Sequence, residues 1–280
     1  MPTLVDYNQV FIANLVQQPG IRKSGVNEGL VRHMVLNSLR SYRRKFLEDY
    51  GELVIACDNR NYWRRKLFPY YKAHRKKNRE ESEFDWNEIF RCLNEVKAEL
   101  KSVFPYKVLE FDTAEADDII AIVCKIEEDD TIILSGDKDF VQLQSYDHVK
   151  QYSPIQKKFL DDPAPDDFLK EQIMKGDRGD GIPNFLSKDD VFVNGGRQAP
   201  LSTKKLQAWL KQDPEMFCDY EMLRGYKRNR LLIDLNLIPE SLANEITTNY
   251  REYECNDRSG LLNYFIHKRL KNLTENIEEF

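Results

Sequence analysis

Short, tightly spaced groups of carboxylates recur along this chain, each at or just after a segment expected to be a strand end or a loop. The groups are Asp6, Asp58, Glu115/Asp117/Asp118, Asp137/Asp139 and Asp177/Asp180. Two like charges about 4 Å apart repel by on the order of 4 kcal/mol at an effective dielectric constant near 20. A fold that gathers these acids therefore needs a cation among them, and acids without His or Cys predict Mg²⁺ or Mn²⁺ rather than zinc.

The composition predicts a globular protein with one main domain and a smaller module, because 41% hydrophobic residues in 280 can bury a sizeable core. The chain has no apolar run of about 18 residues and no secretory-type leader, so we expect a cytoplasmic protein without a membrane partner. We also expect a monomer. Five scattered cysteines without C-x-x-C spacing predict neither a disulfide framework nor a zinc site.

Charge is distributed unevenly along the chain. The formal net charge is −5, yet the segment from Arg60 to Arg79 contains nine Lys and Arg residues and no acid. Without those nine the remainder carries −14, so an acidic body bears one strongly basic segment. Aromatic residues are interleaved in this segment, namely Tyr62, Trp63, Phe68, Tyr70 and Tyr71. A charged groove with stacking rings is a common way to hold single-stranded ends, and a solvated helical face is the alternative.

The first half alternates short apolar strands with helices. Strands are expected at residues 4–5, 53–57, 107–111, 131–134 and 149–152, and helices from residue 9, over 27–50 and over 86–103. A further helix should carry Glu115, Asp117 and Asp118 on its first turns, with Asp112 or Thr113 as its cap. This alternation predicts an α/β fold with a largely parallel sheet, whose ligands gather at the carboxyl ends of the strands.

The second half is expected to be helical. Helical patterns cover about 166–175, 202–212, 215–224 and 239–250, while 231–237 is apolar but too short to classify. We predict an α/β domain over 1–160 and a helical domain over 161–280. The final residues Asn276–Phe280 are expected to fray, with a partner-binding tag as the alternative.

The acid groups suit a pair of divalent ions. Two ions about 4 Å apart can activate water and stabilise both oxygens of an in-line phosphate displacement. Acids at positions 115, 117 and 118 can reach toward a common centre at a helix start, where the helix dipole tolerates anions. Any one acidic pair alone is more often a solvated cap, but five groups at strand ends favour a site.

In their order, these groups resemble those of the 5′-nuclease (flap endonuclease) superfamily. The most specific segment is Gly176–Asn184, G-D-R-G-D-G-I-P-N, and Tyr71–Arg75 resembles the basic Y-K-x-x-R element of the helical arch in that family. Within the superfamily, Asn61–Arg65, Arg79–Ser82 and Leu232–Asp234 are similar to the T-even bacteriophage ribonuclease H branch. The resemblance implies a PIN-like core, a basic arch over about 59–85 and a helix-turn-helix-like region over about 177–212.

The resemblance also implies roles for individual residues. First-metal ligands would be Asp6, Asp58, Glu115 and Asp117, and second-metal ligands would be Asp137, Asp139 and Asp180. Asp117 would lie between the ions, although Asp118 could equally take this role, and Asp118 and Asp177 could be outer-shell groups. Lys72 and Arg75 would be catalytic, stabilising charge at the scissile phosphate. Implied nucleic-acid contacts are Arg64, Arg65, Lys72, Arg75, Lys76, Arg79, Arg197, Lys204 and Lys205.

One segment departs from the family pattern. After Asn184 the family continues with a G-I-G-x-x-T-A type turn, whereas here residues 185–200 are longer and lack it. The resemblance therefore does not carry over the family's monovalent-ion site. Gly195 and Gly196, with Arg197, Lys204 and Lys205, could still present a loop and a helix start to duplex phosphates, and ordinary surface residues are an equal alternative.

The function implied is a two-metal phosphodiesterase: a Mg²⁺-dependent 5′→3′ exonuclease and flap endonuclease in which Mn²⁺ can substitute. Its partners would be DNA and RNA–DNA duplexes with 5′ ends or flaps, and its task the removal of RNA primers during phage-type lagging-strand replication. A single-strand-binding protein or a sliding clamp is a candidate protein partner. The alternatives are a PIN-type single-strand endoribonuclease and a non-catalytic DNA-binding protein. An aspartyl phosphatase is disfavoured because position 8 is Asn8.

Overall fold

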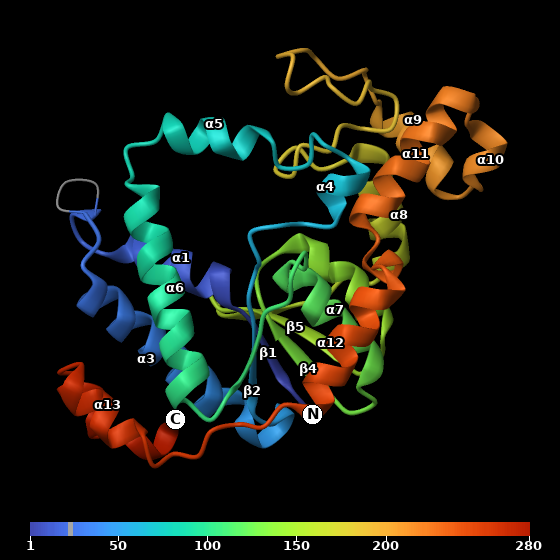
Figure 1. The fold of residues 1–280 in the computed structure, drawn as a ribbon. Helices are drawn as coiled ribbons and strands as arrows, with labels where there is room; N and C mark the ends of the chain where they lie inside the picture. Colours follow the sequence, from blue (N-terminus) through green and yellow to red (C-terminus); the bar gives the residue numbers. More distant parts are fainter. Residues whose placement is uncertain (22–24) are drawn as a thin grey trace.

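The computed structural model describes residues 1–21 and 25–280 and centres on one six-stranded sheet (Figure 1). The strands are β1 (Thr3–Asp6), β2 (Leu53–Ala56), β3 (Lys107–Leu109), β4 (Thr131–Leu134), β5 (Val149–Ser153) and β6 (Lys158–Leu160). Their order is β3-β2-β1-β4-β5-β6, and all neighbours are parallel except β5 and β6. The predicted α/β class and mostly parallel sheet are confirmed. The antiparallel β6 was not predicted, because three residues around Phe159 carry no clear strand pattern.

Helices cover both faces of the sheet, as the alternation of strand side chains requires. Val5 points into a core with α1 (Tyr7–Gln17), α3 (Glu28–Tyr50) and α6 (Trp86–Val103). Leu4, its neighbour in β1, points into the opposite core with α7 (Ala116–Ile126) and α12 (Glu240–Glu252). Strands buried on both faces explain why the strand segments are continuously apolar.

The register of the parallel strands brings the first acids to one edge. Asp6 pairs with Ala56 of β2, and Val5 pairs with Leu134 of β4. The residues that follow these strand ends, including Asp58, therefore emerge at the same carboxyl edge. A 3₁₀ helix, η1 (Lys138–Ser145), follows β4 after the Gly turn.

The expected cap of α7 at Asp112 or Thr113 is wrong. The chain makes another turn first, in which the Ala114 N–H donates to the Phe111 carbonyl at 3.2 Å and Thr113 has a φ of +65°. Glu115 is the N-cap and forms a reciprocal capping box with Asp118. A Ser/Thr/Asp signal is short-range, so it cannot distinguish a turn from the helix start that follows it.

The basic segment crosses over the carboxyl edge of the sheet. It contains two short helices, α4 (Arg64–Leu67) and α5 (His74–Glu80), and leads into α6. Figure 1 shows α5 lying above the sheet between α6 and α4, as an arch.

The second half is helical, as predicted, but one predicted helix is two. The structure has α8 (Pro165–Lys175), α9 (Thr203–Leu210), α10 (Pro214–Phe217), α11 (Tyr220–Ile233) and η2 (Leu235–Leu237). The pattern predicted one helix over 215–224, which is wrong because Asp219 accepts a hydrogen bond from the Met222 N–H and starts a new helix. The apolar stretch 231–237 is the end of α11 followed by η2.

The C-terminal segment packs against the first half. It forms α13 (Leu261–His267), α14 (Lys271–Thr274) and η3 (Ile277–Glu279). Phe280 is fully buried, with its ring 5.8 Å from that of Phe104 and 5.0 Å from that of Phe265. The expected frayed end is therefore wrong, because an aromatic side chain gains more from this core than the chain loses in entropy. The division at about residue 160 stays a prediction.

Within the described ranges, no helix is both long and apolar enough to cross a bilayer.

Candidate active site

A cavity of about 500 Å³ lies between the carboxyl edge of the sheet and the arch, and we call it the arch cavity. Four acids from separate parts of the sequence line it: Asp6, Asp58, Asp117 and Asp137. Lys72, Arg75 and Arg79 of the arch line it as well. The tertiary fold thus brings acids from β1, the β2 end, α7 and the β4 end to the same cavity as the cations of the arch.

Asp6 and Asp58 are held by backbone N–H donors. Asp6 caps α1 by accepting from the Gln9 N–H at 3.0 Å, and Asp58 accepts from the Ala116 N–H at 2.7 Å. Burial, with the nearby charge of Asp58, raises the pKa of Asp6 to about 7. Burial also raises the pKa of Asp58, although the Ala116 hydrogen bond opposes the shift. A cation bound nearby would therefore stabilise the charged form of both carboxyls.

Asp117 belongs to two cavities. Besides the arch cavity, it lines a smaller one of about 20 Å³, the inner cavity, together with Asp139, Asp177 and Asp180. A space of this size holds about one water molecule. Burial, followed by repulsion from Asp137, raises the pKa of Asp117 well above its usual range. Asp117 is thus the acid that joins the two groups of carboxylates.

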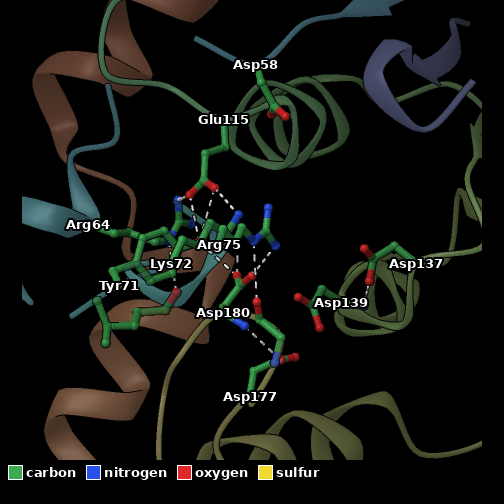
Figure 2. Close-up of polar contacts among 12 residues, drawn as sticks. Asp58, Arg64, Tyr71, Lys72, Arg75, Glu115, Asp137, Asp139, Asp177 and Asp180 are labelled. Carbon is green, nitrogen blue, oxygen red and sulfur yellow. Dashed lines mark hydrogen bonds and ion pairs between the residues drawn. The ribbon is translucent and has the colours of Figure 1, made fainter. Parts of the chain in front are cut away.

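Asp137 and Asp139 flank the start of η1. Asp137 accepts from the Asp139 N–H at 3.0 Å, and Asp139 accepts from the side-chain amide of Gln172 at 2.7 Å. Burial and the charge of Asp137 raise the pKa of Asp139 to about 7. Asp177 accepts from the Gly179 N–H at 2.6 Å and pairs with Lys138 at 2.7 Å. Figure 2 shows Asp137 and Asp139 across the site from Glu115.

Lys72 and Arg75 reach from the arch onto the acids. Lys72 forms an ion pair with Glu115 and lies 3.5 Å from Asp180, while Arg75 bonds Asp180 at 2.7 Å. Figure 2 shows these cations between Glu115 and Asp180. Burial disfavours the charged form of Lys72, but Glu115 and Asp180 outweigh it and raise the pKa of the ammonium. Lys72 therefore stays protonated.

The backbone fixes this arrangement. Lys72 has a φ of +54°, and its N–H donates to the Asp180 carbonyl at 2.7 Å. Gly181 follows with a φ of +75°, and a Cβ there would lie 3.0 Å from the Tyr70 carbonyl oxygen. The glycine of the G-D-G segment thus permits close contact between that segment and the arch.

Asp118, which follows Asp117 in α7, is fully buried. Its carboxylate accepts from Arg64 at 2.8 and 3.0 Å, from the Trp63 indole at 3.1 Å and from the Glu115 N–H at 2.9 Å. Arg64 also donates to Glu115 at 2.8 Å and to the Leu232 carbonyl at 2.8 Å. Asp118 lines neither cavity. Its hydrogen bonds instead hold Glu115 and the base of the arch in place.

The prediction that Arg64 contacts nucleic acid is wrong. Its side chain is 3% exposed, and its donors are directed at Glu115, Asp118 and Leu232. Arg65, Lys76 and Arg79 remain accessible on the arch. A basic run shows where charge is plentiful, but not which of its members folds inward to neutralise buried acids.

The arch aromatics are mostly core residues. Trp63, Phe68 and Tyr71 are buried, and the Tyr71 hydroxyl donates to Glu115 and Asp180 at 2.8 and 2.9 Å. Tyr62 does line the arch cavity.

Arg197, Lys204 and Lys205 are exposed in and after the long loop that joins α8 to α9. Gly195 has a φ of +66° in an exposed turn. These residues are placed for contact with a duplex, and their role stays a prediction.

The donor set fits a hard divalent ion in its chemistry, since all of its groups are carboxylate or amide oxygens. The buried Oδ1 atom of Asn8, beside Asp58 in the arch cavity, has no hydrogen-bond partner in the described structure, as expected where ordered water or a hydrated ion is needed. Among residues 1–21 and 25–280, no three His, Cys, Asp or Glu side chains converge closely enough to hold an ion as they stand. Positive charge next to these acids is supplied by Lys72, Arg75 and Lys138.

Several residues that line the arch cavity or hold the acids of the site were missed in the sequence. Asn8 donates to Asp58 at 2.7 Å, and Gln172 holds Asp139. Trp86 and Phe90 of α6 form an apolar wall of the arch cavity. The signal that could have found this wall is the aromatic pair at i and i+4 on the helix that follows the basic segment.

Comparison with known proteins places both halves of the chain in a family. Residues 4–172 match the family model of the 5′-3′ exonuclease N-terminal resolvase-like domain, and residues 165–280 match that of the T4 RNase H C-terminal domain. Ribonuclease H of Enterobacteria phage T4 is 33% identical over 291 aligned positions, which cover 99% of this chain and 95% of that protein.

Solved structures show the same fold. A T5 protein co-crystallised with metal ions, a T5 flap endonuclease in complex with DNA and metal ions, and a T5 5′-exonuclease with bound zinc each give a TM-score of 0.61 at 16% identity. Each alignment covers 90% of this chain and 98–99% of the other. The family match and the T4 relative together extend over nearly the whole sequence, so the chain belongs to the 5′-3′ exonuclease family that includes phage T4 ribonuclease H.

Proposed function

We propose that this protein is a Mg²⁺-dependent 5′→3′ exonuclease and flap endonuclease. It would hydrolyse phosphodiester bonds at the 5′ ends of RNA–DNA and DNA duplexes and remove RNA primers during phage-type lagging-strand replication. The observation that carries the proposal is the arch cavity, in which acids from four segments face Lys72 and Arg75. Membership of the 5′-3′ exonuclease family over both halves of the chain favours this function over a PIN-type endoribonuclease or a non-catalytic DNA-binding protein.

The acids divide into two proposed ligand groups. Asp6, Asp58 and Glu115 would serve the first ion, Asp137, Asp139 and Asp180 the second, and Asp117 would lie between them because it lines both cavities. When bound, two such ions would activate a water and neutralise charge on the reacting phosphate. Asp118 and Asp177 would orient the groups around them: Asp118 binds Arg64, and Asp177 binds backbone N–H groups and Lys138.

The arch residues would stabilise charge that develops on the phosphate. The Lys72 ammonium and the Arg75 guanidinium already lie against Glu115 and Asp180, so they would contact a phosphate held among these acids. The exposed cations Arg65 and Lys76 and the half-buried Arg79, with Arg197, Lys204 and Lys205, would hold the nucleic-acid backbone.

The test is cleavage of three 5′-labelled substrates: a flap, a nicked duplex and an RNA–DNA hybrid. Short products are expected with Mg²⁺ or Mn²⁺ and none with EDTA. The variant Asp137→Asn is compared with the wild type, because it removes one carboxylate charge at nearly constant shape. It should bind the flap but not cut it. Equal cleavage by this variant in Mg²⁺ would reject the ligand assignment, and equal cleavage of a closed circular duplex would reject the requirement for a 5′ end.

A further inference from the structure

We infer that Phe90 and Trp86 of α6 form a stacking site for an unpaired nucleobase of the 5′-terminal strand, inside the arch cavity. The inference rests on the proposed function, because it concerns how the same cavity receives its substrate. It assigns to α6 a contact that neither the acids nor the arch cations can supply.

The first observation is the exposure of Phe90. The core face of α6 is formed by Ile89, Cys92, Val96 and Leu100, which are all buried. Phe90 lies off this face, 39% exposed, and lines the arch cavity. A large ring left partly exposed at the wall of a cavity offers apolar area that a ligand can cover.

The second observation is that the ring pair is held in place. The Trp86 indole N–H donates to the Ser82 hydroxyl at 2.8 Å, and the Trp86 ring packs edge-on against that of Phe84 at 6.2 Å. The centroids of Trp86 and Phe90 are 5.7 Å apart with planes inclined by 38°. A surface fixed in this way loses little entropy when a flat ligand binds to it.

The third observation is the chemistry of the surrounding walls. The Arg79 guanidinium lies 5.7 Å from the centre of the Phe90 ring, and Arg75 lines the same cavity. Ile12 and Leu93 extend the apolar wall, while the acids Asp6 and Asp58 lie on another. The cavity therefore combines cations that can bind a phosphate with rings that can stack on a base. These are two of the parts of a nucleotide, and the acids of the same cavity can bind metal ions.

The arch's own rings leave this task to α6. Trp63, Phe68 and Tyr71 are buried in the core, so they present no face to a base. Tyr62 lines the cavity, but the Arg65 guanidinium lies 4.8 Å and the Lys72 ammonium 5.3 Å from the centre of its ring, so these cations already occupy it. Stacking on an aromatic ring tolerates every base, so the site would recognise a single strand without reading its sequence. A base inside a duplex is already stacked on both faces by its neighbours, so the site would select for an unpaired 5′ arm.

The test moves an abasic residue along the single-stranded arm of a 5′-flap substrate. The enzyme concentration that gives half-maximal single-turnover cleavage in Mg²⁺ is measured for each position. For the wild type, one position should raise this concentration about tenfold, as expected for loss of one stacked base. For Phe90→Leu the intact flap should already bind about tenfold more weakly, and the abasic residue should add no further loss. Phe90→Tyr keeps a ring and should restore the wild-type pattern.

Tyr220→Leu serves as the matched control, because Tyr220 is an exposed aromatic residue on α11 that does not line the arch cavity. Its abasic profile should equal that of the wild type. If the wild type cuts the flap but Phe90→Leu keeps the same abasic penalty, the stacking site is overturned and the proposed function stands. If the wild type cuts no flap with either ion, the proposed function falls and the stacking site with it.

Discussion

The Arg64 guanidinium and the Asp118 carboxylate form a fully buried two-point ion pair, with nitrogen–oxygen distances of 2.8 and 3.0 Å. Asp117, the preceding residue in the chain, lines both cavities instead. Neighbouring aspartates on one helix turn therefore have different surroundings: Asp118 is neutralised by Arg64, and Asp117 has no ion-pair partner within the described part of the chain.

This difference predicts opposite effects of two matched substitutions. Asp118→Asn leaves Arg64 with one buried partner fewer and should lower the free energy of unfolding by about 3 kcal/mol. Asp117→Asn removes repulsion and should leave metal-free stability unchanged or higher, while it abolishes cleavage. Urea unfolding and flap cleavage of both variants check this, and the reverse assignment of the two effects would contradict it.

The free energy of unfolding of the metal-free protein should fall as the pH rises from 5 to 8. The pKa of Asp6 in the folded protein is raised to about 7 from its usual 3.8, chiefly by burial. The folded state therefore binds more protons at Asp6 than the unfolded state between these values, so the stability that Asp6 contributes is fully present below about pH 4 and is lost as the pH rises through 7. Unfolding in EDTA should show this slope, and Asp6→Asn, which keeps the helix cap, should make it shallower. A slope identical in both proteins would rule out Asp6 as its source.

The same shift should make metal binding depend on pH. A carboxyl with a pKa near 7 must lose its proton to bind a divalent ion, and Asp139 shares this raised pKa. The rise in melting temperature caused by 5 to 10 mM Mg²⁺, about what a weakly held ion requires, should be larger at pH 8 than at pH 6. Asp139→Asn should reduce this difference. An equal rise at both pH values would contradict the expectation.

Lys72→Ala should act on the rate rather than on binding. The ammonium is buried against Glu115 and Asp180, where it would stabilise phosphate charge, so its loss should slow single-turnover cleavage about 100-fold. The concentration for half-maximal rate should change little, because the exposed arch cations remain. Lys76→Ala is the control on the same arch, with its side chain 82% exposed. An unchanged single-turnover rate in Lys72→Ala would remove this lysine from the site.

Binding by the arch should depend steeply on salt. Each phosphate contact contributes roughly 0.7 to 0.9 to the slope of log K against log salt, so Lys76→Ala should flatten that slope by about this amount and weaken binding modestly. Lys101, exposed near the far end of α6, offers a control substitution that should leave the slope unchanged. A flat response of the wild type to salt would contradict the arch as a nucleic-acid clamp.

Phe280 should contribute strongly to stability. Its ring is fully buried between Phe104 and Phe265, so Phe280→Ala should lower the free energy of unfolding by about 3 kcal/mol or more. Ile266→Ala, at an exposed apolar position on α13, should change it by less than about 0.5 kcal/mol. Equal stability of Phe280→Ala and wild type in urea unfolding would mean that the C-terminal residue does not belong to the core.

Much of the fold and the location of the site could be predicted from local pattern. Apolar runs that end in Asp6 and Asp58 predict parallel strands with acids at one edge, because parallel strands share a direction. The capping of α7 could not be predicted, since the turn at Thr113 competes with the Glu115 start on equal local terms. The burial of the Arg64 side chain could not be predicted either, because its partners Asp118 and Leu232 are 54 and 168 residues away in the sequence.

The sequence by itself determined the α/β class, the acidic edge and the presence of a basic segment beside it, since periodicity and charge are local properties of the chain. Only the tertiary structure decided which members of those groups meet. It turned Arg64 and Asp118 inward, left Asp117 facing two cavities and set Phe90 on a cavity wall. The physical reason is that a buried charge or an exposed ring is defined by its neighbours, and these neighbours come from segments that only folding brings together.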